Sequence, residues 1–161
     1  MSLIFSRQKN FFQKIESLFF SAGVQALLLF RLSSFFNRFR ITRLLRFHSF
    51  IYRLNQFLCN VDISPGASIG KNFLMPHASG IVIGDTAVIG NDVTLMHNVT
   101  IGTRRLGEAG KRHATIGDNV FIGPNTVILG NIVIGDNAQI GSNSVVLTDV
   151  GSDEKIWGIH K

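Results

Sequence analysis

An aliphatic residue recurs at every sixth position through two long stretches of this chain, and seven of the ten are followed directly by glycine. A period of six matches neither the 3.6-residue repeat of a helix nor the two-residue alternation of a simple sheet. It is typical of a parallel β-helix, in which short strands stack coil upon coil and each repeat buries one aliphatic side chain. The ten positions are Ile83, Ile89, Leu95 and Ile101, then Ile116, Ile122, Ile128, Ile134, Ile140 and Val146.

Turn-forming residues separate these aliphatic positions. Gly84-Asp85 and Gly117-Asp118-Asn119 are examples of residues that adopt positive φ or hydrogen-bond their own backbone. The fourth position after each aliphatic residue is small or β-branched, which suits a narrow interior. The pattern therefore predicts a prism whose corners are formed by Gly, Asn and Asp.

Basic and aromatic residues are concentrated in the first sixty residues. This part holds nine Lys or Arg and a single acid, Glu16, whereas the rest holds seven basic and nine acidic residues. Of the fourteen phenylalanines, only Phe73 and Phe121 lie beyond residue 60. Such a shift in composition indicates a domain boundary. We expect a mainly β protein with a basic, Phe-rich helical segment at 1–60, a β-helix domain at 61–150 and a C-terminal tail at 151–161.

The first segment has the apolar spacing of amphipathic helices, one over 11–36 and one before residue 60. Such helices are suited to two roles. They can pack on protein, either as a cap on the end of the β-helix or against a sister subunit, or they can lie as a basic surface on an anionic membrane leaflet. Nucleic acid is not an expected partner, because no recognition module is present. The apolar line of the second helix is Leu44, Phe47, Ile51, Leu54 and Leu58.

No targeting segment is evident in the sequence. The apolar run at 18–30 is interrupted by Gln25, lacks a cleavage site after it and is too short to span a bilayer. The lone Cys59 cannot form an internal disulfide and is expected to be a buried small hydrophobe. We expect a cytoplasmic protein, with peripheral contact at the inner face of the membrane as an open alternative.

Two breaks interrupt the sixfold register, and insertions in a repeat protein are where function concentrates. Earlier repeats at Ile63, Ile69 and Met75 predict the next aliphatic position at 81, but the later frame starts at 83, so two residues are inserted. After residue 101 the frame resumes nine residues late, which predicts an extruded loop at 103–114. The first break contains His77 and the second contains His113.

Several ordered motifs carry a family resemblance. The motifs at 62–70, 77–87 and 99–102 and the pair Arg112-His113 resemble, in order and near spacing, the catalytic domain of bacterial serine acetyltransferases. The resemblance implies a left-handed β-helix, acetyl-CoA as co-substrate with no metal, and a homotrimer with active sites between subunits. Pairing of two trimers remains open.

The resemblance also assigns roles to individual residues. It implies that His77 is the general base, that Asp62 orients it and that His113 is a second active-site histidine. A hydroxyl is a poor nucleophile near neutral pH, so a neutral imidazole must take its proton, and a carboxylate on the other ring nitrogen fixes the tautomer. His97, on a coil near the first register break, is the alternative base.

Coenzyme contacts are expected on the extruded loop and along successive coils. Arg104 and Arg105 are candidates for the coenzyme phosphates, although charged loop residues are commonly only solvated. For the pantetheine arm, the resemblance points to backbone and small side chains. These candidates are Gly102, Thr103, Gly123, Thr126 and Ser142.

The acceptor site departs from the family pattern. The residue before the catalytic histidine is usually an aspartate that holds the amino acid's ammonium, but here it is Pro76, and no aspartate precedes Asp62. An unpaired buried ammonium is costly. With Pro76 and Arg112 as acceptor-site residues, we expect a sugar O-acetyltransferase of polysaccharide biosynthesis acting on a glycan hydroxyl. Serine O-acetylation in cysteine biosynthesis is the alternative, and a non-catalytic scaffold or a membrane-recruited assembly subunit are alternatives of another class.

Overall fold

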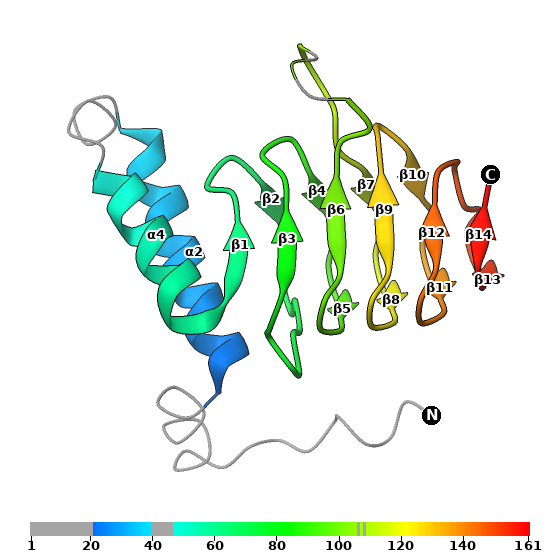
Figure 1. The fold of residues 1–161 in the computed structure, drawn as a ribbon, viewed down its shortest axis with the longest axis horizontal. Helices are drawn as coiled ribbons and strands as arrows, with labels where there is room; N and C mark the ends of the chain where they lie inside the picture. Colours follow the sequence, from blue (N-terminus) through cyan, green and yellow to red (C-terminus); the bar gives the residue numbers. More distant parts are fainter. Residues whose placement is uncertain (1–20, 40–46, 106, 108) are drawn as a thin grey trace.

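The computed structural model describes residues 21–39, 47–105, 107 and 109–161. It is a left-handed parallel β-helix with two α-helices beside its first coil (Figure 1), so the predicted fold class is confirmed. The helices are α2 (Ala22–Arg38) and α4 (Phe47–Cys59). The strands are β1 (Val61–Ile63), β2 (Ser68–Ile69), β3 (Ile81–Ile83), β4 (Val88–Ile89), β5 (Thr94–Leu95), β6 (Thr100–Gly102), β7 (Thr115–Ile116), β8 (Phe121–Ile122), β9 (Val127–Leu129), β10 (Val133–Ile134), β11 (Gln139–Ile140), β12 (Val145–Val146), β13 (Lys155–Ile156) and β14 (Ile159–His160).

Three parallel sheets form the walls of the prism. Sheet 1 has the order β1-β3-β6-β9-β12-β14, sheet 2 the order β2-β4-β7-β10 and sheet 3 the order β5-β8-β11-β13. The chain passes through sheets 1, 2 and 3 in turn, so that every coil has a 1–2 corner, a 2–3 corner and a 3–1 corner. These three names are used below to place the functional residues.

Strand register confirms both predicted insertions. Val82 pairs with Thr100 and Val127 with Val145, a step of 18 residues or three hexapeptides. Asp62 pairs with Val82, a step of 20, and Thr100 pairs with Val127, a step of 27. The extra two residues lie in a 3–1 corner and the extra nine in a 1–2 corner. The second insertion, 103–114, leaves the prism between β6 and β7 (Figure 1).

The sixfold aliphatic residues line the inside of the prism, and each of the ten is at most 2% exposed. Stacked side chains of this kind form one continuous apolar core that grows with each coil. The 3–1 corners carry asparagines at positive φ, which asparagine tolerates better than other side chains. Asn98, Asn125 and Asn143 have φ of 56°, 58° and 58°, and each amide donates to the next at 3.0 Å. The corners are thus cross-linked from coil to coil.

The two helices pack on each other and on the first coil. Arg31 of α2 donates to the carbonyls of Ile69 at 2.8 Å and Gly70 at 2.6 Å, and α4 leads directly into β1. This is the packing expected of a cap on the end of the β-helix. Among the described residues, no helix combines the length and the apolar composition that a membrane span requires. The portion of the expected first helix before residue 21 lies outside the described residues.

The buried face of α4 differs from the predicted one. Ile51, Asn55 and Cys59 point inward, whereas Leu58 is 60% exposed; Leu44 lies outside the described residues. The side-chain amide of Asn55 donates to the carbonyl of Ala26 at 3.0 Å. A polar residue with a partner in the helix–helix contact rotates the face away from the apolar line. Cys59 is buried, as expected for a small hydrophobe.

The coils continue into 151–161, the segment that the sequence sets apart as a tail. β13 pairs with β11 in sheet 3, and β14 pairs with β12 in sheet 1. Ile156 supplies one more buried aliphatic side chain. The sixfold register does not reach this far, which is why the sequence pattern missed the last coil.

Candidate active site

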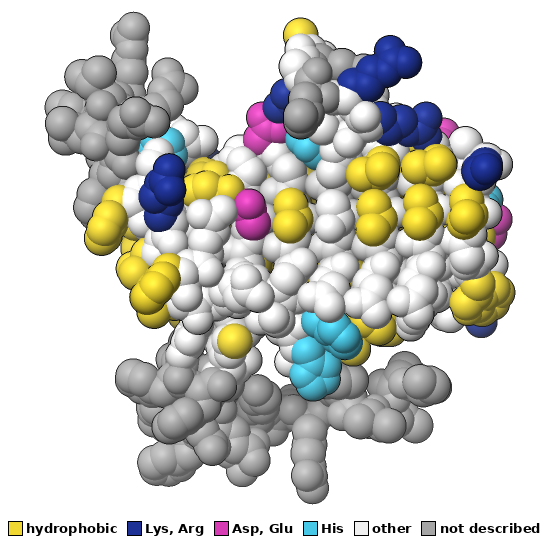
Figure 2. All heavy atoms as spheres, in the orientation of Figure 1, with side chains coloured by type: hydrophobic (Ala, Val, Ile, Leu, Met, Phe, Trp, Pro, Cys, Tyr) yellow, Lys and Arg dark blue, Asp and Glu magenta, His cyan; other side chains and the backbone are white. Residues whose placement is uncertain are grey.

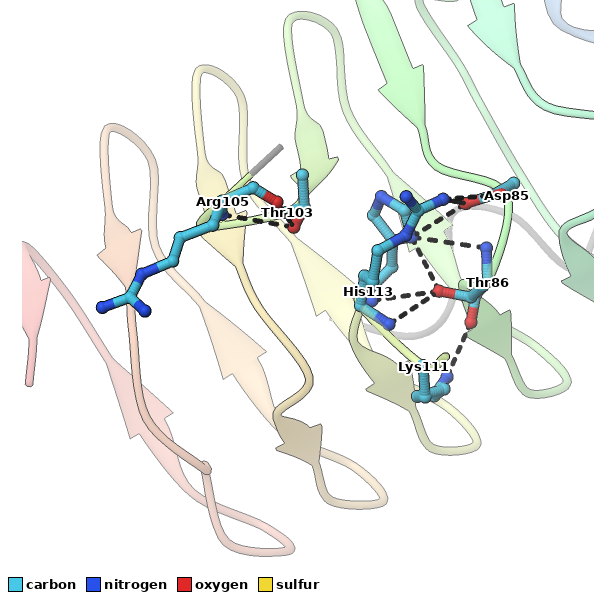
Figure 3. A network of polar contacts seen from close by, with 7 residues as sticks. Asp85, Thr86, Thr103, Arg105, Lys111 and His113 are labelled. Atoms are coloured by element: carbon cyan, nitrogen blue, oxygen red, sulfur yellow. Dashed lines mark hydrogen bonds and ion pairs between the residues drawn. The ribbon is translucent and has the colours of Figure 1, made fainter. Parts of the chain in front are cut away.

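The 1–2 corner below the extruded loop holds a cluster of polar contacts around His113 (Figure 3). Asp85 and Thr86 come from the turn after β3, and His113 comes from the returning end of the loop. The Thr86 hydroxyl lies 2.8 Å from Nδ1 of His113, and the Thr86 backbone N–H donates to the same nitrogen at 3.3 Å. Lys111 donates its ammonium to the Thr86 carbonyl at 2.7 Å.

His113 is buried, with a side chain 8% exposed. Burial lowers its pKa below the ordinary value of 6.5, Asp85 raises it, and Arg112 and Lys111 lower it. The ring lies directly over Gly84, where an added Cβ would collide with it. The absence of a side chain at Gly84 therefore makes room for the imidazole.

Arg112 is held by an ion pair. Its Nη2 lies 2.8 Å from both carboxylate oxygens of Asp85, and the two side chains are 26% and 45% exposed. Asp85 Oδ1 also lies 3.4 Å from Nδ1 of His113. The predicted acceptor-site arginine is thus engaged within the chain, and the loop is tied to the coil below it.

His77 lies in the first insertion, at a 3–1 corner. It follows Pro76, and both side chains are exposed. Its ring stands edge-on to the ring of His97 on the next coil, with centroids 6.2 Å apart. Nδ1 of His97 is buried without a hydrogen-bond partner in the described part of the chain. The two histidines that the sequence offered as bases are therefore neighbours.

Asp62 points outward from β1 and accepts a hydrogen bond from the Tyr52 hydroxyl of α4. Burial, followed by this hydrogen bond, raises the pKa of Tyr52 above its ordinary value. Among the described residues, Asp62 makes no hydrogen bond to His77, the residue that the family resemblance implies it orients. The reason is the register: Asp62 pairs with Val82 in sheet 1, whereas His77 lies in the preceding corner.

A single chain does not bring the two predicted active-site histidines together. His77 precedes sheet 1 at a 3–1 corner, and His113 follows it at a 1–2 corner. The strands of sheet 1 run between these two corners. The sequence placed both residues in insertions but could not place the insertions at different edges of the prism.

A cleft of about 640 Å³ lies beside the extruded loop. Arg104 and Arg105 line it on one side, and 130–132 and 147–149 on the two following coils line the other. Thr103, at the base of the loop, donates its hydroxyl to the Arg105 carbonyl at 2.8 Å. Gly102 ends β6 immediately before it. Four of the predicted coenzyme residues therefore share one corner, and two of them, Arg104 and Arg105, line the cleft.

The remaining predicted coenzyme residues lie at the 3–1 corners. Gly123 packs against the backbone of Ser142 on the next coil, where an added Cβ would lie 2.7 Å from its nitrogen, and Ser142 is exposed. Thr126 is fully buried, and its hydroxyl donates to the Gly141 carbonyl at 3.1 Å. Its side chain faces the prism interior, which leaves only the backbone of Thr126 as a predicted coenzyme contact.

Sequence reasoning missed three side chains that hold the predicted site residues: Tyr52, Asp85 and Thr86. Each lies on a different element from the residue that it contacts. Tyr52 lies on α4 and contacts Asp62 of β1, whereas Asp85 and Thr86 lie in the turn after β3 and contact the loop. Asp85 and Thr86 fall inside a motif used for the family resemblance, so their presence was visible. Their contact with a histidine 27 residues later along the chain was not.

Comparison with known proteins agrees with this architecture. Residues 113–148 match the family model for bacterial transferase hexapeptide (six repeats). Serine acetyltransferase of Helicobacter pylori is 40% identical over 137 residues, 85% of this chain and 78% of that protein. Mitochondrial serine acetyltransferase 3 of Arabidopsis thaliana is 57% identical over 90 residues, 56% of this chain and 23% of that protein.

Solved structures give the same result. Soybean serine acetyltransferase complexed with serine superimposes with a TM-score of 0.83 at 39% identity, over 89% of this chain and 57% of that one. The chain thus spans from about a quarter to about four fifths of the length of these relatives. A 40% identity that covers most of both chains in the Helicobacter comparison, together with the hexapeptide match and the shared fold, shows that this chain belongs to the serine acetyltransferase family of hexapeptide-repeat transferases.

Proposed function

We propose that this protein is an acetyl-CoA-dependent O-acetyltransferase in which His77 is the general base. The observation that carries the proposal is that the two insertions hold His77 and His113 at the two corners that flank sheet 1. Membership of the serine acetyltransferase family supports the same reaction class. An exposed histidine at an edge of sheet 1 is suited to taking a proton from a hydroxyl.

The site is completed by assembly into a homotrimer. The outer face of sheet 1 carries rows of apolar side chains (Figure 2), which include Val82 at 39% and Ile159 at 67% exposure. An apolar face of this kind is typical of a subunit interface. Packing sheet 1 of three copies around a common axis brings the His77 corner of one subunit towards the His113 corner of the next.

The reaction follows from general acid–base chemistry. His77 takes the proton of the acceptor hydroxyl as its oxygen attacks the thioester carbonyl, and the proton then passes to the departing thiolate of coenzyme A. We assign Asp62 to orient His77. The Tyr52 hydroxyl engages Oδ1 of Asp62, and Oδ2 accepts no hydrogen bond among the described residues, so that oxygen remains available for an imidazole N–H.

The cleft beside the loop supports a site for acetyl-CoA. Arg104 and Arg105 supply two cations for its phosphates, and arginine is well suited to bind phosphate oxygens. Gly102 and Thr103 continue this site towards sheet 1. Gly123 and Ser142 would face it from the 3–1 corners of a neighbouring subunit. Replacing both arginines with alanine is expected to raise the KM for acetyl-CoA more than it lowers kcat.

Serine is the leading acceptor, because the relatives described above are serine acetyltransferases and one of them is complexed with serine. Similarity to these relatives supports serine as the acceptor better than it supports the sugar hydroxyl expected from the sequence. Arg112 is the residue proposed to meet the acceptor from the loop. A glycan hydroxyl is the second candidate, favoured by Pro76, which offers neither charge nor N–H beside His77.

The test measures release of coenzyme A from acetyl-CoA with serine and with a panel of glycans. His77→Ala is expected to lower the rate by about 10²- to 10⁴-fold without unfolding the protein, because the side chain is exposed. His97→Ala is the matched control and is expected to lower the rate far less. Equal rates for wild type and His77→Ala would disprove the assigned base.

Pro76→Asp identifies the acceptor. A carboxylate at this exposed position is expected to raise kcat/KM for serine by roughly tenfold, because it supplies a counter-charge for the ammonium. Glycan acetylation, if it is the native activity, should gain nothing from this change. A wild-type enzyme that acetylates a glycan and ignores serine would replace the leading acceptor with the second candidate.

A further inference from the structure

We propose that Thr86 is a positioning residue that fixes His113 as the tautomer carrying its proton on Nε2. The inference rests on the proposed function, because it makes His113 a hydrogen-bond donor in acetyl transfer instead of a second base. Thr86 lies in the turn after β3 and His113 at the end of the loop, and the two converge at one 1–2 corner (Figure 3).

The backbone of Thr86 indicates which ring nitrogen of His113 is protonated. Its N–H donates to Nδ1 at 3.3 Å. A backbone amide is only a donor, so Nδ1 must present its lone pair to this contact. In a neutral imidazole, the other ring nitrogen, Nε2, then carries the proton.

The hydroxyl of Thr86 leads to the same assignment. Its oxygen accepts the backbone N–H of Arg112 at 2.9 Å and that of His113 at 3.2 Å. These two bonds use both acceptor sites of the hydroxyl and leave its own proton to donate. Nδ1 of His113, 2.8 Å away, is placed to receive it. Two donors from one residue therefore converge on one ring atom.

The charged neighbours of the ring leave this assignment in place. Asp85 lies 3.4 Å from Nδ1 and favours a protonated ring, but Arg112 already pairs with both oxygens of that carboxylate at 2.8 Å. Lys111 bonds the Thr86 carbonyl and adds a second positive charge. Burial acts in the same direction as these two cations, and the pKa of His113 is lowered overall. The ring is therefore neutral near neutral pH.

A neutral His113 of this tautomer has a restricted chemical role. Nδ1 already accepts from Thr86, so the ring cannot take a proton there without losing those hydrogen bonds. Its Nε2–H can donate to an oxygen that gains negative charge, such as that of the thioester carbonyl during attack. Proton abstraction then falls to His77, and the two histidines of the site have different functions.

Nitrogen NMR of the histidine rings in the full-length protein tests the tautomer directly. The His113→Gln variant assigns the His113 signals by their loss. We expect His113 of the wild type to show a protonated Nε2 and an unprotonated Nδ1 at neutral pH. A protonated Nδ1, or a doubly protonated ring, would overturn the inference.

Thr86→Val and Thr86→Ser test the part played by the hydroxyl. Valine keeps the shape and removes the hydrogen bonds of Oγ1, which leaves the longer 3.3 Å backbone contact as the only Thr86 donor to Nδ1. We therefore expect part of the ring population to change tautomer and kcat to fall by roughly 10- to 100-fold with little change in KM for acetyl-CoA. Serine keeps the hydroxyl, so we expect the wild-type tautomer. Thr94→Val is the matched control, because Thr94 faces outward on sheet 3 and its hydroxyl makes no hydrogen bond among the described residues.

The outcomes separate this inference from the proposed function. Unchanged His113 signals and kcat in Thr86→Val would refute the positioning role. If Thr86→Val does not fold, the wild-type tautomer and its retention in Thr86→Ser still decide the question. A wild-type protein with the expected tautomer but no acetyl transfer to any acceptor would refute the proposed function and leave the structural role of Thr86 intact.

Discussion

Arg112 and Asp85 are joined by a single guanidinium nitrogen that lies 2.8 Å from both carboxylate oxygens. This ion pair links the returning end of the extruded loop to the coil below it. It also sets the charge beside His113, because the same carboxylate lies 3.4 Å from Nδ1 of the ring. Asp85 therefore acts on both predicted active-site residues of the loop.

Asp85→Asn is expected to lower the pKa of His113 further. The negative charge of Asp85 raises that pKa, so its removal leaves burial, Arg112 and Lys111 unopposed. Titration of the His113 ring by NMR measures the change. Because the pair is 26% and 45% exposed, its loss should reduce the free energy of unfolding by less than about 1 kcal/mol.

The control for this variant is Asp136→Asn. Asp136 lies at a 2–3 corner and accepts the backbone N–H of Asp118 at 2.7 Å, a contact that an asparagine oxygen can keep. The Asp136→Asn substitution removes the same negative charge at a distant corner, where salt screens the effect of that charge on the pKa of His113. An equal shift of the His113 pKa in both variants would contradict the local role of Asp85.

Stability is expected to fall as the pH drops below about 6.5. The folded-state pKa of His113 lies below the ordinary value of 6.5, so the unfolded state binds the proton first as the pH falls. The resulting loss in the free energy of unfolding begins near the pKa of His113 in the unfolded state and continues down to its lower pKa in the folded state. Urea unfolding at several pH values between about 7 and 5 measures it. His113→Gln should flatten this dependence, and an unchanged slope would argue against a lowered pKa.

Gly84→Ala is expected to abolish most acetyl transfer while the β-helix stays folded. The new methyl group would collide with the imidazole of His113 and force the ring out of its place. Circular dichroism and the acetyl transfer rate together separate the two effects. Gly151→Ala is the control, because its Cβ would meet only the flexible end of Glu154 at 3.3 Å. Full activity in Gly84→Ala would show that the ring position is unimportant.

Thr126→Val is expected to reduce stability without changing the KM for acetyl-CoA. The buried Thr126 hydroxyl donates to the Gly141 carbonyl at 3.1 Å, and Ser144 donates to the same oxygen at 2.7 Å. Loss of one of the two hydrogen bonds to this half-buried carbonyl costs about 1 kcal/mol. Thermal unfolding and the KM check the two parts. A raised KM would return Thr126 to the coenzyme site.

The period of six was sufficient to predict the β-helix and the positions of both insertions. Each hexapeptide buries its own aliphatic residue, so every six-residue repeat contains the pattern that specifies the fold. The last coil was missed because the coil step shortens between Val145 and Ile159 to 14 residues. The buried face of α4 was also missed, because Asn55 finds its hydrogen-bond partner on another helix.

The sequence by itself determined the repeat, the core residues and the presence of a histidine in each insertion, since these depend on the order of residues along the chain. Only the tertiary structure decided that His77 and His113 lie on opposite edges of sheet 1 and that Asp62 bonds Tyr52. It alone also decided that Thr86 reaches His113. Such contacts join residues on different coils or elements, and their geometry depends on how the coils stack and turn, which residue types and spacing do not specify.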